Sequence, residues 1–168
     1  MAIVASADAG LRAGPRATIL QLRAPGMPVS SLEREAARLV VASPVPVVIS
    51  SRCDVALACG AAGVNLPERD LSPRDARLLL GDRLVGKSVH SLEAALAAEG
   101  DGADYVIFGP VWASASHPGG APAGIEALAR VAAAISVPVL AIGGVTPARI
   151  PECLGAGAAG YAAIGMFE

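Results

Sequence analysis

Two strand-like segments near the end of the chain finish in glycine, and they constrain the fold more than any other feature. They span residues 139–144 and 160–165, and Thr146-Pro147 between them has the residue types that cap and begin a helix. Two such units in series are how the last strands of a (β/α)₈ barrel form a phosphate pocket. Glycine lets the backbone approach a ligand, and its free N–H groups bind anions. We therefore expect a small phosphorylated ligand at Gly143, Gly144, Ile164 and Gly165.

The rest of the chain repeats the same unit. Strand-like segments recur with helical stretches between them, which is typical of a parallel sheet. The strands are expected at residues 17–23, 45–50, 63–66, 84–88, 105–109, 139–143 and 160–164, with a weaker eighth at 3–6. This pattern predicts one α/β domain over residues 1–168, a (β/α)₈ TIM barrel.

The two ends of the chain depart from a full barrel. Only residues 7–16 separate the first two strands, so the first βα unit is expected to be stunted or to lack its helix. The sequence stops at Glu168, which leaves no room for a final helix. Apolar barrel surface is then expected to lie uncovered at this seam, and self-association into a homo-oligomer could cover it.

Helix starts are indicated by local signals. Ser30 and Glu33 have the spacing of a capping box, and Pro73 follows a capping serine. The expected first or capping residues are Ser30, Ser72, Ser91, Gly124 and Thr146.

Composition excludes several classes of protein. The chain is 54% hydrophobic and 17% charged, with a net charge of −2, and it has no basic run, so nucleic acid is not an expected partner. No apolar stretch reaches the roughly 18 residues of a membrane span, and no signal peptide is evident. The three cysteines fit no zinc spacing. These features predict a cytoplasmic protein with reduced thiols.

The longest connection, residues 109–124, follows the sixth expected strand. It contains Trp112, Ser114, Ser116 and His117. Long βα loops at the carboxyl ends of barrel strands usually carry function, so we interpret this one as a mobile active-site loop. The alternative is a surface loop without a role.

Seven segments in register resemble one family. They are Gln21-Leu22-Arg23, Asp54–Ala58, Gly63–Leu66, Val85–Ser88, Gly102–Val111, Ala141–Val145 and Gly157–Gly165. In this order they resemble the thiamine-phosphate synthase/TenI family, over about Ala17 to Phe167. The resemblance implies a (β/α)₈ barrel that joins or processes the two halves of thiamine. The synthase reaction displaces pyrophosphate from an aminopyrimidine by the nitrogen of a thiazole phosphate.

The resemblance implies two substrate subsites. The glycines at 143, 144 and 165, with Ile164, match the positions for the thiazole phosphate. Gln21 and Arg23 match a pair that contacts the pyrimidine pyrophosphate, and a structural polar bridge is the alternative reading. Ser88 matches a ligand-contacting serine or caps the following helix, and Gly109 ends the strand beside it.

The implied magnesium site is incomplete. Ser50-Ser51 stands where the family has an Asn-Asp pair, and Arg52 follows, which adds repulsion. A hydroxyl is a poorer Mg²⁺ ligand than a carboxylate. Asp70 matches the second family carboxylate, or is simply a loop carboxylate near the next helix. Mg²⁺ is therefore expected only if synthase activity is retained.

Cationic and acid/base groups also differ from the family pattern. Pro25 replaces a lysine, and His117 with Ser114 and Ser116 stands at the positions of a loop lysine and two threonines. The histidine of TenI proteins is replaced by Pro110. The expected catalytic set is Ser114, Ser116, His117 and Arg23.

Four functions remain open at this point. Loss of charge at the pyrophosphate site favours a TenI-like thiazole tautomerase, in which His117 shuttles the proton from the loop without Mg²⁺. The alternatives are a thiamine-phosphate synthase with a degraded metal site, a non-catalytic thiamine-phosphate-binding regulator and another phosphate-binding barrel. The expected partner is a small phosphorylated thiazole or thiamine phosphate. His90 is expected at a helix start rather than in the site.

Overall fold

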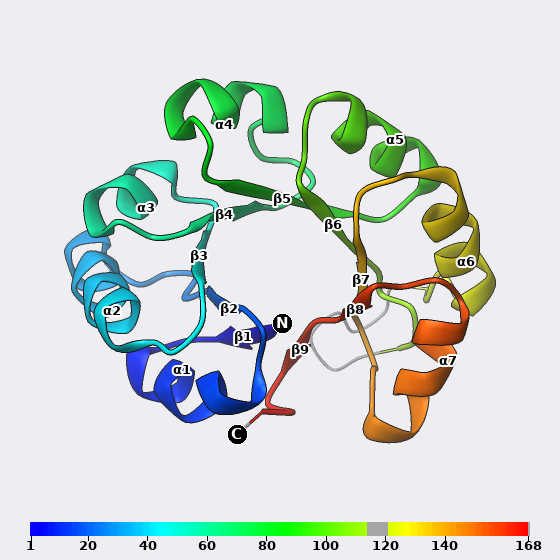
Figure 1. Ribbon diagram of the computed structural model, residues 1–168, viewed down its shortest axis with the longest axis horizontal. Helices are drawn as coiled ribbons and strands as arrows, with labels where there is room; N and C mark the ends of the chain where they lie inside the picture. Colours follow the sequence, from blue (N-terminus) through cyan, green and yellow to red (C-terminus); the bar gives the residue numbers. More distant parts are fainter. Residues whose placement is uncertain (114–120, 168) are drawn as a thin grey trace.

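The computed structural model describes residues 1–113 and 121–167 and forms a closed barrel of parallel strands inside a ring of helices (Figure 1). Successive strands pair in chain order, and β9 pairs with β1 to close the ring. β8 and β9 are two halves of the eighth strand, separated by Ala162. The strands are β1 Ala2–Val4, β2 Leu20–Leu22, β3 Val47–Ser50, β4 Gly63–Leu66, β5 Leu84–Val89, β6 Tyr105–Phe108, β7 Val139–Ala141, β8 Gly160–Tyr161 and β9 Ala163–Ile164. The TIM-barrel prediction is confirmed.

The helices lie outside the strands and alternate with them (Figure 1). They are α1 Ala7–Ala13, α2 Val29–Ala42, α3 Cys53–Cys59, α4 Pro73–Leu80, α5 Leu92–Gly100, α6 Ile125–Ala134 and α7 Ile150–Gly155, with 3₁₀ turns η1 Gly14–Arg16 and η2 Pro147–Arg149. None of the helices in the described ranges is long and apolar enough to cross a lipid bilayer.

The first and last units of the barrel have the expected departures. α1 has seven residues and is followed only by the short turn η1. Residues 165–167 after β9 form no helix, and Ile164 is 56% exposed. The Phe167 ring stacks on Tyr161 with centroids 5.8 Å apart, and the Phe167 carbonyl accepts a hydrogen bond from Arg16. Self-association at this seam stays a prediction.

Three of the expected helix starts are confirmed. The Ser72 and Ser91 hydroxyls accept hydrogen bonds from Asp75 and Ala94, and Gly124 precedes α6. Two expectations need correction. α2 begins at Val29 after Pro28, whose carbonyl accepts the N–H of Ser31 and Leu32, so Ser30 lies within the first turn and caps nothing. Thr146 precedes η2, but its side chain makes no capping hydrogen bond.

The barrel interior and the helix layer form separate apolar clusters. Inward-facing side chains such as Ile3, Val48 and Ile107 fill the centre of the barrel, together with Tyr105. The outward-facing residues of the strands pack against the helices in two larger clusters. The interior packing supports the strand ends, where ligands bind in this architecture.

Gly63 holds β4 close to β5. A Cβ at this position would lie 1.9 Å from the Leu84 carbonyl oxygen, which is backbone and cannot rotate away. We expect Gly63→Ala to lower the free energy of unfolding by about 2 kcal/mol, because overpacking of this size forces backbone shifts. Gly100→Ala is the matched control, since nothing lies within 4 Å of its Cβ position. Urea unfolding of both variants checks the prediction, and equal stability of the two would contradict it.

Candidate functional site

A cavity of about 600 Å³ opens where the carboxyl ends of the strands meet. Its wall combines polar side chains from β2 to β5 with the glycine-containing turn after β7. The lining residues include Gln21, Arg23, Ser50, Asn65, Glu68, Ser88, His90, Gly109, Pro110, Gly143, Gly144, Thr146, Arg149 and Ile164. Seven of the residues expected in a ligand site are therefore brought together: Gln21, Arg23, Ser88, Gly109, Gly143, Gly144 and Ile164.

The β2–β5 side of the cavity carries hydrogen-bonding groups that lack partners. Gln21 and Asn65 are each 2% exposed, and the oxygens Gln21 Oε1 and Asn65 Oδ1 have no hydrogen bond to the described part of the chain. Asn65 Nδ2 donates to Ser88 Oγ at 3.0 Å, so Ser88 is held by the wall and does not cap α5. Buried acceptors without a donor are costly, which favours a ligand with N–H groups here.

Arg23 stands at the rim beside this wall. Its side chain is exposed, and within residues 1–113 and 121–167 no carboxylate forms a salt bridge with it. A structural polar bridge is not observed among these residues. An uncompensated guanidinium in a cavity suits a phosphate or pyrophosphate group, because arginine can donate two parallel hydrogen bonds to such an anion.

The turn after β7 has the backbone conformation expected of an anion site. Gly143 and Gly144 have φ angles of +91° and +65°, and Gly165 after β9 has +76°. The N–H groups of these three glycines make no hydrogen bond to another backbone group that the structure describes. Trp112 N donates to the Gly143 carbonyl at 3.0 Å, and this hydrogen bond fixes the turn. Gly165 lies next to cavity-lining Ile164 but is not itself part of the lining.

Arg149 is a cavity residue that sequence reasoning missed. Its Nη1 donates to the Gly144 carbonyl at 2.7 Å, and its guanidinium lies 4.9 Å from the centre of the Trp112 ring. A cation–π contact of this kind holds the positive charge beside the glycine turn. The sequence could have indicated Arg149 by its position in the first turn after Thr146, which closely follows the glycines at 143 and 144.

Asp70 lies just outside the cavity lining, next to β3. Its carboxylate accepts hydrogen bonds from the Ser51 hydroxyl and from Leu71 N, the latter at 2.8 Å. The repulsion expected from Arg52 is compensated, because Arg52 Nε donates to Asp54 Oδ1 at 2.8 Å. This partner lowers the pKa of Asp54 to about 2.

The donor set fits a weakly held Mg²⁺ only. In the described ranges, no three His, Cys, Asp or Glu side chains converge as a metal site. Asp70 with the Ser51 hydroxyl supplies one carboxylate and one neutral oxygen. Magnesium commonly takes one or two carboxylates and completes its shell with water and substrate phosphates. The residues therefore fit an ion shared with a bound pyrophosphate, not one enclosed by protein.

His90 directly precedes Ser91, the capping residue of α5, as expected, and it also lines the cavity. Its Nδ1 contacts the Gly109 carbonyl, and its Nε2 lies 3.9 Å from Glu68 Oε2. Its backbone N–H donates to Glu68 Oε1 at 3.2 Å, so this histidine and carboxylate form a pair. The expected loop residues Ser114, Ser116 and His117 lie outside the described residues.

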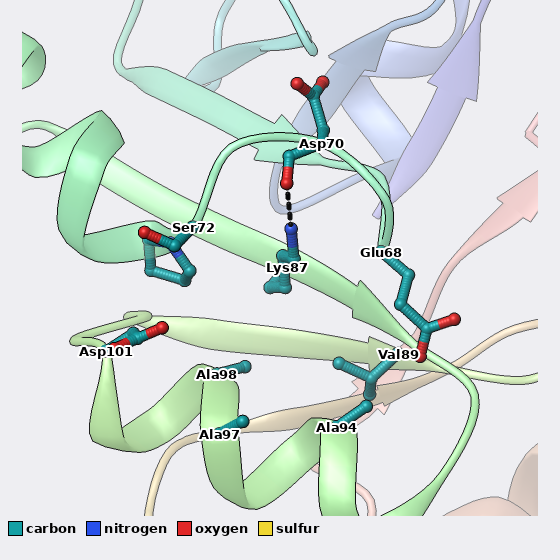
Figure 2. Close-up of a pocket in the computed structure, with 10 residues that line it drawn as sticks. Glu68, Asp70, Ser72, Lys87, Val89, Ala94, Ala97, Ala98 and Asp101 are labelled. Carbon is teal, nitrogen blue, oxygen red and sulfur yellow. Dashed lines mark hydrogen bonds between the residues drawn. The ribbon is translucent and has the colours of Figure 1, made fainter.

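A second hollow, of about 240 Å³, lies outside the barrel between the β4–α4 loop and α5 (Figure 2). Lys87 from β5 points into it and is only 7% exposed. Removal from water lowers the pKa of the Lys87 ammonium, although the nearby Asp70 and Glu68 oppose this effect. Its Nζ donates to the carbonyls of Asp70 and Leu71.

Comparison with known proteins places the chain among thiamine-biosynthesis proteins. Residues 2–167 match the model of the thiamine monophosphate synthase (TMP-TENI) family. The thiamine-phosphate synthase of Anaeromyxobacter dehalogenans is 42% identical over 166 residues, which are 96% of this chain and 73% of the relative. The enzyme of the same name from Chloroflexus aurantiacus is 40% identical over 121 residues, 71% of this chain, and the match spans about half (56%) of its length.

A solved structure agrees with these sequence matches. Thiamine phosphate pyrophosphorylase from Pyrococcus furiosus superimposes with a TM-score of 0.87 at 29% identity, covering 97% of this chain and 83% of that one. The fold, the family model and the identity with the two synthases point the same way. The chain belongs to the thiamine-phosphate synthase/TenI family.

Proposed function

We propose that this chain is a thiamine-phosphate synthase, which joins an aminopyrimidine pyrophosphate to a thiazole phosphate. The observation that carries the proposal is the presence of two different binding walls in one cavity. The β2–β5 wall has unpartnered hydrogen-bond acceptors and Arg23, and the β7 turn has glycine N–H groups and Arg149. A reaction with two substrates, each bearing an anion, needs two such walls. The names of the relatives support the same activity.

Each wall has a role in this proposal. Gln21 Oε1 and Asn65 Oδ1 accept hydrogen bonds from the amino group of the pyrimidine and fix its ring. Arg23 binds the pyrophosphate and stabilises the negative charge that grows as it leaves. The glycine turn at 143–144 holds the phosphate of the thiazole. This arrangement aligns the thiazole nitrogen with the carbon that loses pyrophosphate.

Asp70, with the Ser51 hydroxyl, is the proposed protein ligand for Mg²⁺. When bound, the ion neutralises the departing pyrophosphate. The carboxylate already faces Ser51, the residue after cavity-lining Ser50. One carboxylate holds the ion less firmly than two, so this chain is expected to need more Mg²⁺ than relatives with both.

Restoring the second carboxylate is a direct test of this metal site. We expect Ser51→Asp to lower the Mg²⁺ concentration for half-maximal activity about tenfold, because Mg²⁺ prefers carboxylate oxygen to hydroxyl. Ser51 has φ = +70°, a conformation that aspartate and asparagine adopt more readily than most residues. Ser51→Asn is therefore the control: it has the same shape without the charge. An equal Mg²⁺ requirement for both variants would contradict the role of this position.

A thiazole tautomerase is the second candidate, favoured by the His90 and Glu68 pair in the cavity. A histidine beside a carboxylate can move a proton within a ring system without a metal. The same reaction could use His117 from the loop, as the sequence predicts.

One set of assays separates the candidates. The purified chain is incubated with both synthase substrates, with Mg²⁺ or with EDTA, and pyrophosphate release is measured. Tautomerisation of a thiazole carboxylate phosphate is followed separately by NMR. Mg²⁺-dependent pyrophosphate release supports the synthase. Tautomerisation without it supports the second candidate, and tight binding of thiamine phosphate without turnover indicates a regulator.

A further inference from the structure

Lys87 occupies a position in β5 where the pattern calls for an apolar residue. Val85 and Val89 on either side share its outward face, and both are fully buried among apolar side chains of the helix layer. Burying an ammonium group costs free energy unless it finds hydrogen-bond partners. A valine would fill the same space without that cost. The contacts of the lysine should therefore explain why it stands here.

Lys87 contacts the backbone of the loop that carries Asp70. Its Nζ donates to the Asp70 carbonyl at 3.2 Å and to the Leu71 carbonyl at 2.8 Å. Figure 2 shows the ammonium below the loop and the Asp70 carboxylate turned away from it. The charge of Lys87 therefore does not neutralise the carboxylate by direct contact.

The two carbonyl contacts fix the direction of the Asp70 side chain. Asp70 N donates to the Pro67 carbonyl at 3.0 Å, and the carboxylate accepts from the Ser51 hydroxyl on the far side of the loop. With Lys87 on the adjoining carbonyls, the backbone at Asp70 is held on both sides. Loss of the ammonium would free two carbonyls in a largely apolar hollow and let the loop turn.

We infer that Lys87 is a positioning residue, which holds the Asp70 loop so that the carboxylate faces the Mg²⁺ and pyrophosphate side of the cavity. The catalytic role of this positioning rests on the proposed synthase function. The contact between Lys87 and the loop does not depend on that function. Lys87 touches no expected substrate, and its effect on catalysis passes through Asp70.

The test replaces Lys87 with methionine, which keeps the length of the side chain and removes its donors. Amide hydrogen exchange at Asp70 and Leu71 is measured in the free protein. Mn²⁺ binding is then measured by EPR with inorganic pyrophosphate present. We expect amide exchange at Asp70 and Leu71 to be about tenfold faster and Mn²⁺ affinity to be about tenfold lower, because the loop loses the donor that its two carbonyls share. Arg74→Met is the control, because Arg74 pairs with Asp101 at the rim of the same hollow at 3.2 Å but does not contact the loop carbonyls.

The outcomes separate the inference from the proposed function. If Lys87→Met has the same amide exchange rates at Asp70 and Leu71 and the same Mn²⁺ affinity as wild type, the positioning role is overturned. Wild-type protein that releases no pyrophosphate from the two substrates would overturn the synthase proposal, while the exchange measurement still decides whether Lys87 holds the loop. If the methionine variant does not fold, Lys87→Gln, with a shorter side chain that keeps an N–H donor, must exchange faster than wild type at the same amides or the inference fails.

Discussion

Replacing Arg23 with methionine is expected to lower kcat/KM for the pyrimidine pyrophosphate about a thousandfold, since losing one preorganised charged group at a leaving anion costs 10²–10³ or more. Arg23 lines the cavity, and no carboxylate in the described ranges neutralises it. Pro25 stands two residues later, where the family resemblance implies a lysine, so little else on this segment compensates for the lost charge. Steady-state pyrophosphate release at saturating Mg²⁺ measures the effect.

Two further variants make the Arg23 result specific. Arg23→Lys keeps the charge but loses the two-point contact, so its activity should fall between wild type and Arg23→Met. Arg130→Met removes an exposed cation of α6, a helix that does not line the cavity, and should leave activity unchanged. If Arg23→Met retains wild-type kcat/KM, pyrophosphate binds elsewhere and the assignment of this wall is wrong.

The fold could be read from the sequence because its signals are local and repeated. Each strand is a short apolar segment followed by a helix start, and the serines at 72 and 91 cap helices as their spacing predicts. The capping box at Ser30 failed because Pro28 fixes the backbone two residues earlier, so that α2 begins at Val29. Local patterns thus place an element correctly even where they misplace its first residue.

The site was harder to predict, because it depends on contacts between distant segments. Sequence reasoning did not single out Arg149, which the fold places beside the Trp112 ring and against the Gly144 carbonyl. Lys87 interrupts an apolar strand, but only the fold shows that it meets the carbonyls of a loop 16 residues earlier. His90 lies at a helix start as expected, but only the fold shows that it also lines the cavity. Pairings of this kind leave no periodic signal in the chain.

Gly144→Ala is expected to weaken binding of thiazole phosphate at least a hundredfold. Gly144 has φ = +65°, and a Cβ there would lie 2.7 Å from both the Ala113 carbonyl oxygen and Trp112 Cβ. The left-handed backbone costs an L-residue roughly 1–2 kcal/mol, and the contacts push the turn away from the geometry that aims its N–H groups at the anion. Titration calorimetry with thiazole phosphate measures the loss directly.

A matched glycine separates strain from the loss of the anion site. Gly60 ends α3 with φ = +69°, and nothing lies within 4 Å of its Cβ position. Gly60→Ala therefore carries the same backbone strain without disturbing the cavity. Its melting temperature should fall, while its affinity for thiazole phosphate stays at the wild-type value. If Gly144→Ala binds thiazole phosphate as tightly as Gly60→Ala does, the phosphate is not held by the turn after β7, and the two-wall arrangement of the cavity no longer supports a synthase.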